Sequence, residues 1–480
     1  MSTDRKIFVY ALEGEPETLD PAAKRYSERA IRVKWLLFDS LINIGSDGRR
    51  PEPGVAEAWT VSDGGRRVDL TIRKGVRFHD GTLLDAQAVK FCFERQFVSD
   101  LHDPKKQVLS ALVDDVQVRD PRTVVLQLKS DAFGYLSRRY LYKLGLVSPH
   151  ALDRLGDDFA RHPVGTGPFM SPEWLPDRIV LSKNPDYWAG TPAIDEVHFR
   201  YIPDGKEALE QLLTGEVHFV PSLSDPEAIQ RALAEPRLTI LVVPGFNVFY
   251  LGLQCRKAPF DQPLMRQAVA RGIDVHRAAL AGKGAATPAC GPLPVHMEGF
   301  DPAVRQHPCD PEAAADLLRQ AGYDGRPITL IHFGPPSFVR DLALAVERDL
   351  RGIGLNLSRR EMPTWADLVK AAAEGDGHLF LYSWHMRTDD AQGFLRALFH
   401  SSNIGVSNLT GYANPEVDRL LDLTPPWEFS AAQATILADA PMVFLAHWTR
   451  VAAHGVRVRH LRLNLGVLPE DKLVGVDLAR

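Results

Sequence analysis

The residue types that most often perform catalysis or bind metals are scattered through this 480-residue chain. Its 16 histidines include no pair at metal-ligand spacing, and the sequence contains no P-loop, GxSxG, HExxH or strand-linked GxGxxG motif. Asp389 and Asp390 form an adjacent carboxylate pair. Such a pair can serve acid–base catalysis, but acids placed just before a helix more often cap its positive end. The sequence therefore predicts no catalytic residue, no metal site and no cofactor.

The four cysteines, Cys92, Cys255, Cys290 and Cys309, contain no CxxC pair. Cys92 lies in a helical pattern and Cys255 ends a strand pattern, so both are expected to be buried thiols, because free cysteine packs as a small hydrophobe. Cys290 and Cys309 flank a loop rich in proline and glycine. A disulfide between these two in an oxidising compartment is left open.

Composition favours a small molecule or another protein as the partner. The net charge is −5, hydrophobic residues make up 45% and charged residues 24%, as in ordinary soluble globular proteins. No cluster of Lys and Arg occurs, so nucleic acid is not an expected partner. The most apolar stretch, residues 238–253, is interrupted by Pro244, Gly245 and Asn247, which predicts two short strands meeting at a bend rather than a membrane span. The first residues lack an apolar core and a cleavage site, so no signal peptide is expected in this chain.

Short strand patterns alternate with amphipathic helical patterns along the chain, which predicts an α/β fold. Strands are expected over 6–12, 68–73, 123–129, 179–188, 197–202, 217–223, 247–254, 328–333, 355–361 and 378–384. Helices are expected over 27–42, 85–96 with Asp85 as N-cap, 205–216, 264–273, 311–323 with Gly322 as C-cap, and 337–355. A second α/β series begins near Pro244, which favours two lobes that close on a cleft by hinge motion.

A dozen segments, in order, resemble the peptide/nickel/opine-binding family of ABC-importer solute-binding proteins, known as solute-binding family 5. They include ETLDP (17–21), FDSLI (38–42), PGVAEAWTVSDGGRRVDLTIRKGVRFHDG (53–81), VGTGPF (164–169), NPDYW (184–188), LFHSSN (398–403) and GYANPEVDRLLD (411–422). The resemblance extends from about residue 8 to about residue 450. It implies a periplasmic-binding-protein type II-like fold with an extra domain, as in peptide-binding members.

The domain boundaries that the resemblance implies are discontinuous. Domain I would comprise 1–41, 163–243 and 455–480, the extra domain II 42–162, and the opposing lobe, domain III, 244–454. Hinges would lie near 243–245 and 454–456. Ligand would be held between domains I and III.

The resemblance also points to residues that meet the ligand. Peptide-binding members have a Trp at a strand end, matched here by Trp384, and an Asp three positions later that pairs with the peptide ammonium. Arg387 occupies that position in this chain. A guanidinium suits a carboxylate or phosphate, which favours an acidic or acylated ligand group. Alternatively, Arg387 pairs with Asp389 or Asp390, or one of these acids binds the amine from a shifted position.

Further ligand contacts are expected at the crossing into domain III and around the first strand-to-helix loop. These candidates are Phe246, Asn247, Tyr250, His385, Glu13 and Tyr26, with Tyr382 as a weaker one. For the aromatic candidates a place in the core is an equal alternative, since aromatic side chains at a strand start are as often buried in the core.

The function that follows is capture of a peptide-like or anionic small molecule for a membrane ABC permease, by a monomeric, non-enzymatic protein located in the periplasm or otherwise outside the cytoplasm. The alternative is a cytosolic member of the same fold that acts as a ligand sensor or as an accessory enzyme of a biosynthetic pathway. The absence of a signal peptide is the sole support for that alternative.

Overall fold

The computed structural model describes residues 5–23, 27–45, 50–97, 109, 112–223, 225–295, 297, 299–334, 337–385, 391–422, 429–464, 468 and 472–479. The chain divides into two compact units, one of residues 1–241 with 451–480 and one of residues 242–450. The chain passes from one unit to the other within β12 (Leu238–Pro244) and returns within β18 (Met442–Gly455). The domain boundaries predicted from the resemblance remain a prediction.

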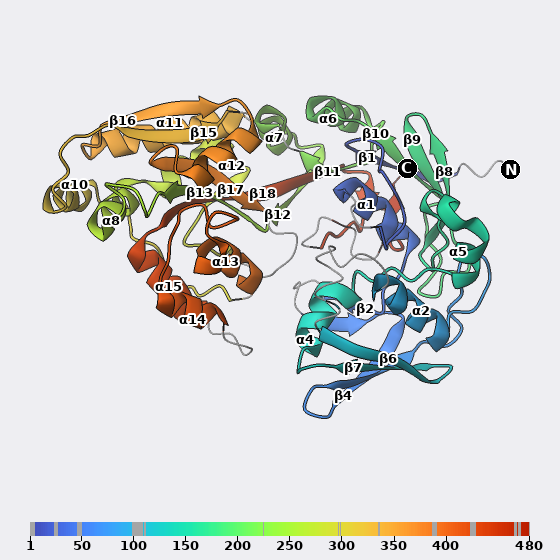
Figure 1. Ribbon diagram of the computed structural model, residues 1–480. Helices are drawn as coiled ribbons and strands as arrows, with labels where there is room; N and C mark the ends of the chain where they lie inside the picture. The colour runs from blue at the N-terminus through green and yellow to red at the C-terminus, as the bar shows by residue number, and fades with distance from the viewer. Residues whose placement is uncertain are drawn as a thin grey trace. The chain divides into compact units, whose positions relative to one another are not determined.

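The first unit is built on a sheet in which β1 is the central strand (Figure 1). β1 (Ile7–Leu12) pairs in parallel with β10 (Glu196–Tyr201) and with β11 (Phe219–Leu223). β9 (Arg178–Lys183) and β8 (Phe169–Leu175) extend the β10 edge by antiparallel pairing. The end of β18 pairs antiparallel with β11. The helices of this unit that follow its parallel strands are α1 (Glu28–Leu37), α6 (Gly205–Thr214) and α7 (Pro226–Leu233).

A separate four-stranded antiparallel sheet lies in the same unit, in the order β4-β5-β7-β6. Figure 1 shows α2 lying against this sheet. Its strands are β4 (Ala56–Ser62), β5 (Arg67–Ile72), β6 (Val113–Asp120) and β7 (Thr123–Leu128), and the remaining elements around it are β2 (Ile42–Ile44), β3 (Pro51–Pro53), α2 (Ala86–Phe97), α4 (Phe133–Leu136) and α5 (Pro149–Leu155). The side chain of Asp85 accepts a hydrogen bond of 2.9 Å from the amide of Ala88, which confirms the predicted cap of α2.

The second unit holds a mixed sheet in the order β16-β15-β17-β13-β18. β15 (Ile328–Phe333) pairs in parallel with β16 (Leu357–Met362) and β17 (Leu379–His385), whereas β13 (Asn247–Leu253) runs antiparallel to β17 and β18. The short β14 (Ala286–Pro288) pairs with β18. The helices of this unit are α8 (Pro263–Gly272), α9 (Val275–Ala279), α10 (Pro311–Gln320), α11 (Ser337–Gly352), α12 (Trp365–Glu374), α13 (Ala391–Phe399), α14 (Pro415–Asp422) and α15 (Phe429–Asp439).

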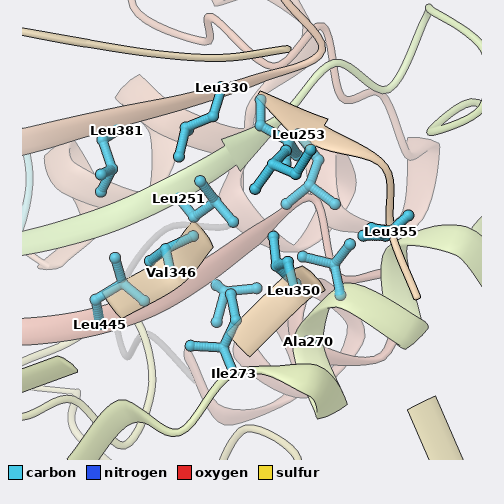
Figure 2. Close-up of a cluster of buried hydrophobic side chains, with 14 of the residues drawn as sticks. Leu251, Leu253, Ala270, Ile273, Leu330, Val346, Leu350, Leu355, Leu381 and Leu445 are labelled. Carbon is cyan, nitrogen blue, oxygen red and sulfur yellow. The ribbon is translucent and has the colours of Figure 1, made fainter. Parts of the chain in front are cut away.

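Both faces of this second sheet are covered, because alternate residues of each strand enter different hydrophobic clusters. Leu251, Leu253, Leu330 and Leu381 pack on one face against α8 and α11 (Figure 2). Their neighbours in sequence, such as Tyr250 and Phe380, pack on the other face with residues of α12, α13 and α15. The strands therefore read as nearly continuous apolar runs, as expected for a sheet buried on both sides.

Most predicted elements are present, but several end earlier than predicted. The strand expected over 179–188 stops at Lys183, and the helices expected over 311–323 and 337–355 stop at Gln320 and Gly352. The apolar stretch 238–253 forms two strands, β12 and β13, that meet at a bend, as predicted. The predicted helix over 27–42 ends earlier: α1 stops at Leu37, and Phe38 is extended, with ψ of 141°. Asp39 and Ser40 are instead drawn into buried hydrogen bonds outside the helix. Tertiary hydrogen bonding thus outweighs local helical propensity there.

Among the described residues, the cysteines form no disulfide and the histidines form no metal site. All four cysteines are free, so the disulfide left open for Cys290 and Cys309 is not formed. Cys92 is buried, as predicted, and burial raises its pKa to about 11. Cys255, also predicted to be buried, is only partly buried, because it lies beyond the end of β13. Within the described ranges, no group of three or more His, Cys, Asp or Glu side chains could hold a metal ion. No described helix is both long enough and apolar enough to span a membrane.

Candidate functional site

The parallel strands of the second unit end in a group of aromatic side chains. In open α/β sheets, ligands bind outside the carboxyl ends of parallel strands. At these ends of β15, β16 and β17 lie Phe333, Met362, Trp365, Tyr382 and Trp384, which we call the aromatic platform. The ring of Trp365 stacks on Tyr382 at 4.5 Å and meets the edge of Phe333 at 6.2 Å. Trp365 is 38% exposed, so the platform reaches solvent.

Local sequence explains the position of Trp365. β16 ends at Met362, and Thr364 caps the next helix by accepting a hydrogen bond of 3.1 Å from the amide of Asp367. Trp365 is therefore the first residue of α12 and lies three residues beyond the strand end. Sequence analysis missed it. The available signal was an aromatic residue inside a Thr-x-x-Asp cap that directly follows a predicted strand.

Trp384 and His385, both predicted ligand contacts, lie on opposite faces of the sheet, because successive strand residues alternate. Trp384 is half-buried and belongs to the aromatic platform. His385 is exposed on the other face, where its Nε2 lies 3.2 Å from Ser383 Oγ and its ring 6.0 Å from that of Phe249. The structure therefore does not bring these two candidates to one surface. Their contact with a ligand stays a prediction.

Both polar atoms of the Asn247 side chain form hydrogen bonds within the second unit. Its Nδ2 donates to the carbonyl of Trp448 at 2.9 Å, and its Oδ1 accepts from the amide of Trp448 at 2.7 Å. Gly245 is required beside this pair, since a Cβ there would come within 2.3 Å of Asn247 Nδ2. Asn247 thereby fastens the start of β13 to β18. Its predicted ligand contact remains untested.

The backbone of Asn247 also orients a buried histidine on β18. His447 Nδ1 lies 2.7 Å from the carbonyl oxygen of Asn247 and must donate to it, because a carbonyl only accepts. Burial lowers the pKa of His447 to about 4, so the ring is neutral at pH 7 and its Nε2 carries a lone pair. Among the described residues this buried Nε2 meets no hydrogen-bond partner, and neither does the hydroxyl of Thr449.

The other two candidates around β13 are placed differently. Tyr250 is fully buried, with its ring 5.9 Å from that of Tyr382, and burial raises its pKa well above 10. Tyr250 is therefore a core residue whose ring packs against Tyr382 of the aromatic platform. Phe246 is half-buried at the bend before β13.

In the first unit, Glu13 follows the carboxyl end of β1 and forms an ion pair with Arg32 of α1. The Arg32 side chain is only 3% exposed, whereas that of Glu13 is 42% exposed. Burial by itself would lower the pKa of Arg32, but Glu13, Tyr10 and Glu28 together more than offset it, and the pKa is raised. Glu28 lies 3.5 Å from the same guanidinium. Glu13 is thus held by a buried cation at the end of a parallel strand.

Three predicted contacts, Tyr26, Arg387 and Asp389, lie outside the described residues, as does Asp390. Their roles stay predictions. α13 begins at Ala391, directly after the acid pair, as the capping interpretation of that pair requires.

Several motif residues of the first unit converge on one buried carboxylate. Asp39 accepts hydrogen bonds from Tyr187 Oη (2.9 Å), Trp188 Nε1 (2.8 Å) and Thr166 Oγ1 (3.1 Å). Lys472 Nζ completes the set at 2.6 Å and also donates to the carbonyl of Phe38 at 2.6 Å. We call these five residues the Asp39 network. Because every oxygen of the carboxylate is used, these motif residues hold the fold.

Comparison with known proteins agrees with this architecture. The fold matches the solved structure of HbpA2 from Haemophilus parasuis with a TM-score of 0.87 and 23% identity, covering 99% of this chain and 100% of the other. It is thus a type II periplasmic-binding-protein fold. Residues 50–406 match the bacterial extracellular solute-binding proteins, family 5. The chain belongs to this family, whose members bind solutes.

Two curated relatives align over nearly the whole chain. The glutathione-binding protein GsiB of Salmonella paratyphi A is 31% identical, with 94% of this chain and 90% of the relative covered. Heme-binding protein A of Haemophilus influenzae is 26% identical, with 95% and 90% covered. The sequence-based family assignment is therefore confirmed.

Proposed function

We propose that this protein is the solute-binding component of a bacterial ABC importer and that its ligand is a small, peptide-like molecule with an acidic group. The observation that carries the proposal is the 31% identity, over 94% of the chain, to a protein named for binding glutathione. Glutathione is a tripeptide with two carboxylates, so it combines the peptide-like and acidic characters that the sequence predicts.

The described residues support this ligand class. The aromatic platform offers flat apolar surface at the carboxyl ends of parallel strands, where it can cover a side chain of the ligand with little loss of side-chain entropy. Arg387 supplies a guanidinium suited to a carboxylate in the sequence segment that follows β17. In the first unit, Arg32 already has Glu13 as its partner, so Arg387 is the better candidate for the acidic group of the ligand.

We also propose where the protein acts and what it does with its ligand. The protein acts outside the cytoplasm, works as a monomer, passes its ligand to a membrane permease and releases it chemically unchanged. Binding is stabilised by a conformation that the ligand prefers, and no covalent step is required.

The direct test is to identify and then measure the ligand. Protein purified from its natural host is denatured, and released small molecules are identified by mass spectrometry. Reduced glutathione, tri-alanine and hemin are then compared by isothermal titration calorimetry and by thermal unfolding. A specific ligand at about 100 times its Kd stabilises the native state by about 2.7 kcal/mol, which raises the melting temperature.

The matched variants are Arg387→Ala and, as control, Arg360→Ala, an exposed arginine paired with Asp376. We expect glutathione or tri-alanine to bind the wild type and the Arg360→Ala control, with weaker binding to Arg387→Ala. Failure of both peptides to bind would overturn the ligand class. Conversion of a bound peptide into a product would overturn the non-enzymatic part of the proposal.

A further inference from the structure

β18 carries two buried polar atoms that lack partners. His447 is 6% exposed and Thr449 is 5% exposed, and neither His447 Nε2 nor Thr449 Oγ1 has a hydrogen-bond partner in the described part of the chain. Other buried polar atoms of this kind, such as Tyr201 Oη and His332 Nδ1, occur singly on their elements. A buried polar atom left without a partner costs free energy and calls for an explanation.

The two atoms belong to one face of the strand. Residues two apart on a strand point to the same side, and β18 is regular here, with Thr287 opposite His447 and Ala286 opposite Trp448. The backbone of this stretch is fully engaged: Thr449 N donates to the carbonyl of Ala285 at 2.8 Å. The unpaired side-chain atoms are therefore not needed to hold the strand in place.

The surroundings of His447 and Thr449 determine which ligand groups these two side chains can bind. Asn247 holds the ring so that Nδ1 donates and Nε2 can only accept, while the hydroxyl of Thr449 can donate or accept. Burial lowers the pKa of His447, and the hydrogen bond to Asn247 partly opposes this shift. Among the described residues no neighbouring charge contributes to it. An ionised ligand group would lose its hydration here without gaining an opposite charge. A neutral ligand group with an N–H next to a carbonyl can bond to both atoms: the N–H donates to His447 Nε2, and the carbonyl accepts from the Thr449 hydroxyl.

We propose that His447 and Thr449 form a subsite that binds a backbone amide of the peptide ligand, with the amide N–H donating to His447 Nε2 and the Thr449 hydroxyl bonding the neighbouring polar atom. This inference rests on the proposed function and deepens it, because it names the part of the ligand that is recognised. It selects peptides over solutes that lack an amide N–H.

The experiment measures affinity for tri-alanine and for its two depsipeptide analogues, in each of which an ester oxygen replaces one amide N–H. The variants are His447→Asn, which keeps a donor near the carbonyl of Asn247 but removes Nε2, and Thr449→Val, which keeps the shape. The control is His198→Asn on β10, a half-buried histidine whose Nε2 lies 2.9 Å from Glu196 Oε2.

We expect His447→Asn to weaken tri-alanine binding about tenfold, the size of one lost hydrogen bond to a buried group, and Thr449→Val to weaken it several-fold. One depsipeptide should bind wild type and His447→Asn equally weakly, and His198→Asn should behave as wild type. Unchanged tri-alanine affinity in both variants would overturn the subsite but leave the proposed function intact. Equal losses for tri-alanine and both depsipeptides, with a lowered melting temperature, would show a structural role and also overturn it. If the wild type binds neither tri-alanine nor glutathione, the proposed function itself fails.

Discussion

The chain buries two groups of polar side chains that differ in how fully their atoms are used. In the first unit, the Asp39 network gives one carboxylate four side-chain donors from residues far apart in the sequence. In the second unit, His447 and Thr449 are buried to a similar degree, yet each keeps one atom without a partner among the described residues. Buried groups with complete partners specify the fold, whereas buried groups with an unused atom are candidates for meeting a ligand.

A histidine of the first unit, His79, can be compared directly with His447. His79 Nδ1 accepts from the amide of Gly165 at 3.2 Å and its Nε2 lies 3.0 Å from the carbonyl oxygen of Gly167, so both nitrogens are used. His447 uses only Nδ1. Gly165 and Gly167 flank Thr166 and leave no room for a side chain, since a Cβ on either would come within 2.3 Å of backbone or ring atoms of α1 and its end. The glycines of the GTGP motif thus allow close packing against the end of α1.

Removing the central carboxylate should have the largest effect. Asp39→Ala leaves the Lys472 ammonium, which is 8% exposed, without its counter-charge and leaves the donors of Tyr187 and Trp188 without an acceptor. We expect the free energy of unfolding to fall by about 3–5 kcal/mol, measured by urea denaturation. The control Glu210→Ala breaks an exposed ion pair with Arg231 and should cost less than about 1 kcal/mol. A loss below about 1 kcal/mol in Asp39→Ala would show that the network does not hold the fold.

Acidification should destabilise the protein through both histidines. Burial lowers the pKa of His79 and of His447 to about 4, below the usual 6.5, so the unfolded chain binds more protons than the native one between pH 4 and 6.5. Stability is therefore complete above pH 6.5 and is lost as the pH falls towards 4. From pH 7 to pH 5 each histidine should remove about 2 kcal/mol of stability.

Urea denaturation of the ligand-free protein at pH 7 and pH 5 measures this dependence. In His447→Asn the loss between the two pH values should shrink by about 2 kcal/mol relative to wild type. An undiminished loss would mean that His447 is not kept neutral by burial, and the comparison with His79 would fail.

A smaller effect on stability is expected at the aromatic platform. Trp365 is 38% exposed, so Trp365→Ala should lower the free energy of unfolding by only about 1 kcal/mol. Its affinity for a peptide ligand should fall more than its stability, because the stacked face on Tyr382 is lost. The matched control is Trp174→Ala, which removes a half-buried tryptophan that packs under Arg161, and it should leave calorimetric affinity unchanged. Equal affinities in wild type and Trp365→Ala would remove the platform from the site.

Much of the fold could be predicted from the sequence because hydrophobic periodicity and capping are local. The bend between β12 and β13 follows from Pro244 and Gly245, and the cap of α2 follows from Asp85. The end of α1 could not be predicted in this way. It depends on Asp39, whose partners Thr166, Tyr187 and Lys472 lie more than 100 residues away in the sequence.

The candidate site was harder to predict for the same reason. The family resemblance pointed to Trp384 but says nothing of Trp365, which reaches the same surface from the next strand exit. Asn247 was predicted to meet ligand, yet both atoms of its amide are bonded to Trp448, 201 residues later. The backbone carbonyl of Asn247 engages His447 Nδ1, and this contact, also invisible in the sequence, is what makes Nε2 the remaining acceptor of the ring.

The most direct test compares two buried threonines by urea denaturation of the ligand-free protein. Thr166 is fully buried and bonded to Asp39, so Thr166→Val should lower the free energy of unfolding by about 1–3 kcal/mol. Thr449 is 5% exposed with no partner for its hydroxyl among the described residues, so Thr449→Val should leave the free energy of unfolding unchanged or raise it by about 1 kcal/mol. Opposite signs would support the division between structural and ligand-facing polar groups. A loss in Thr449→Val as large as that in Thr166→Val would contradict it.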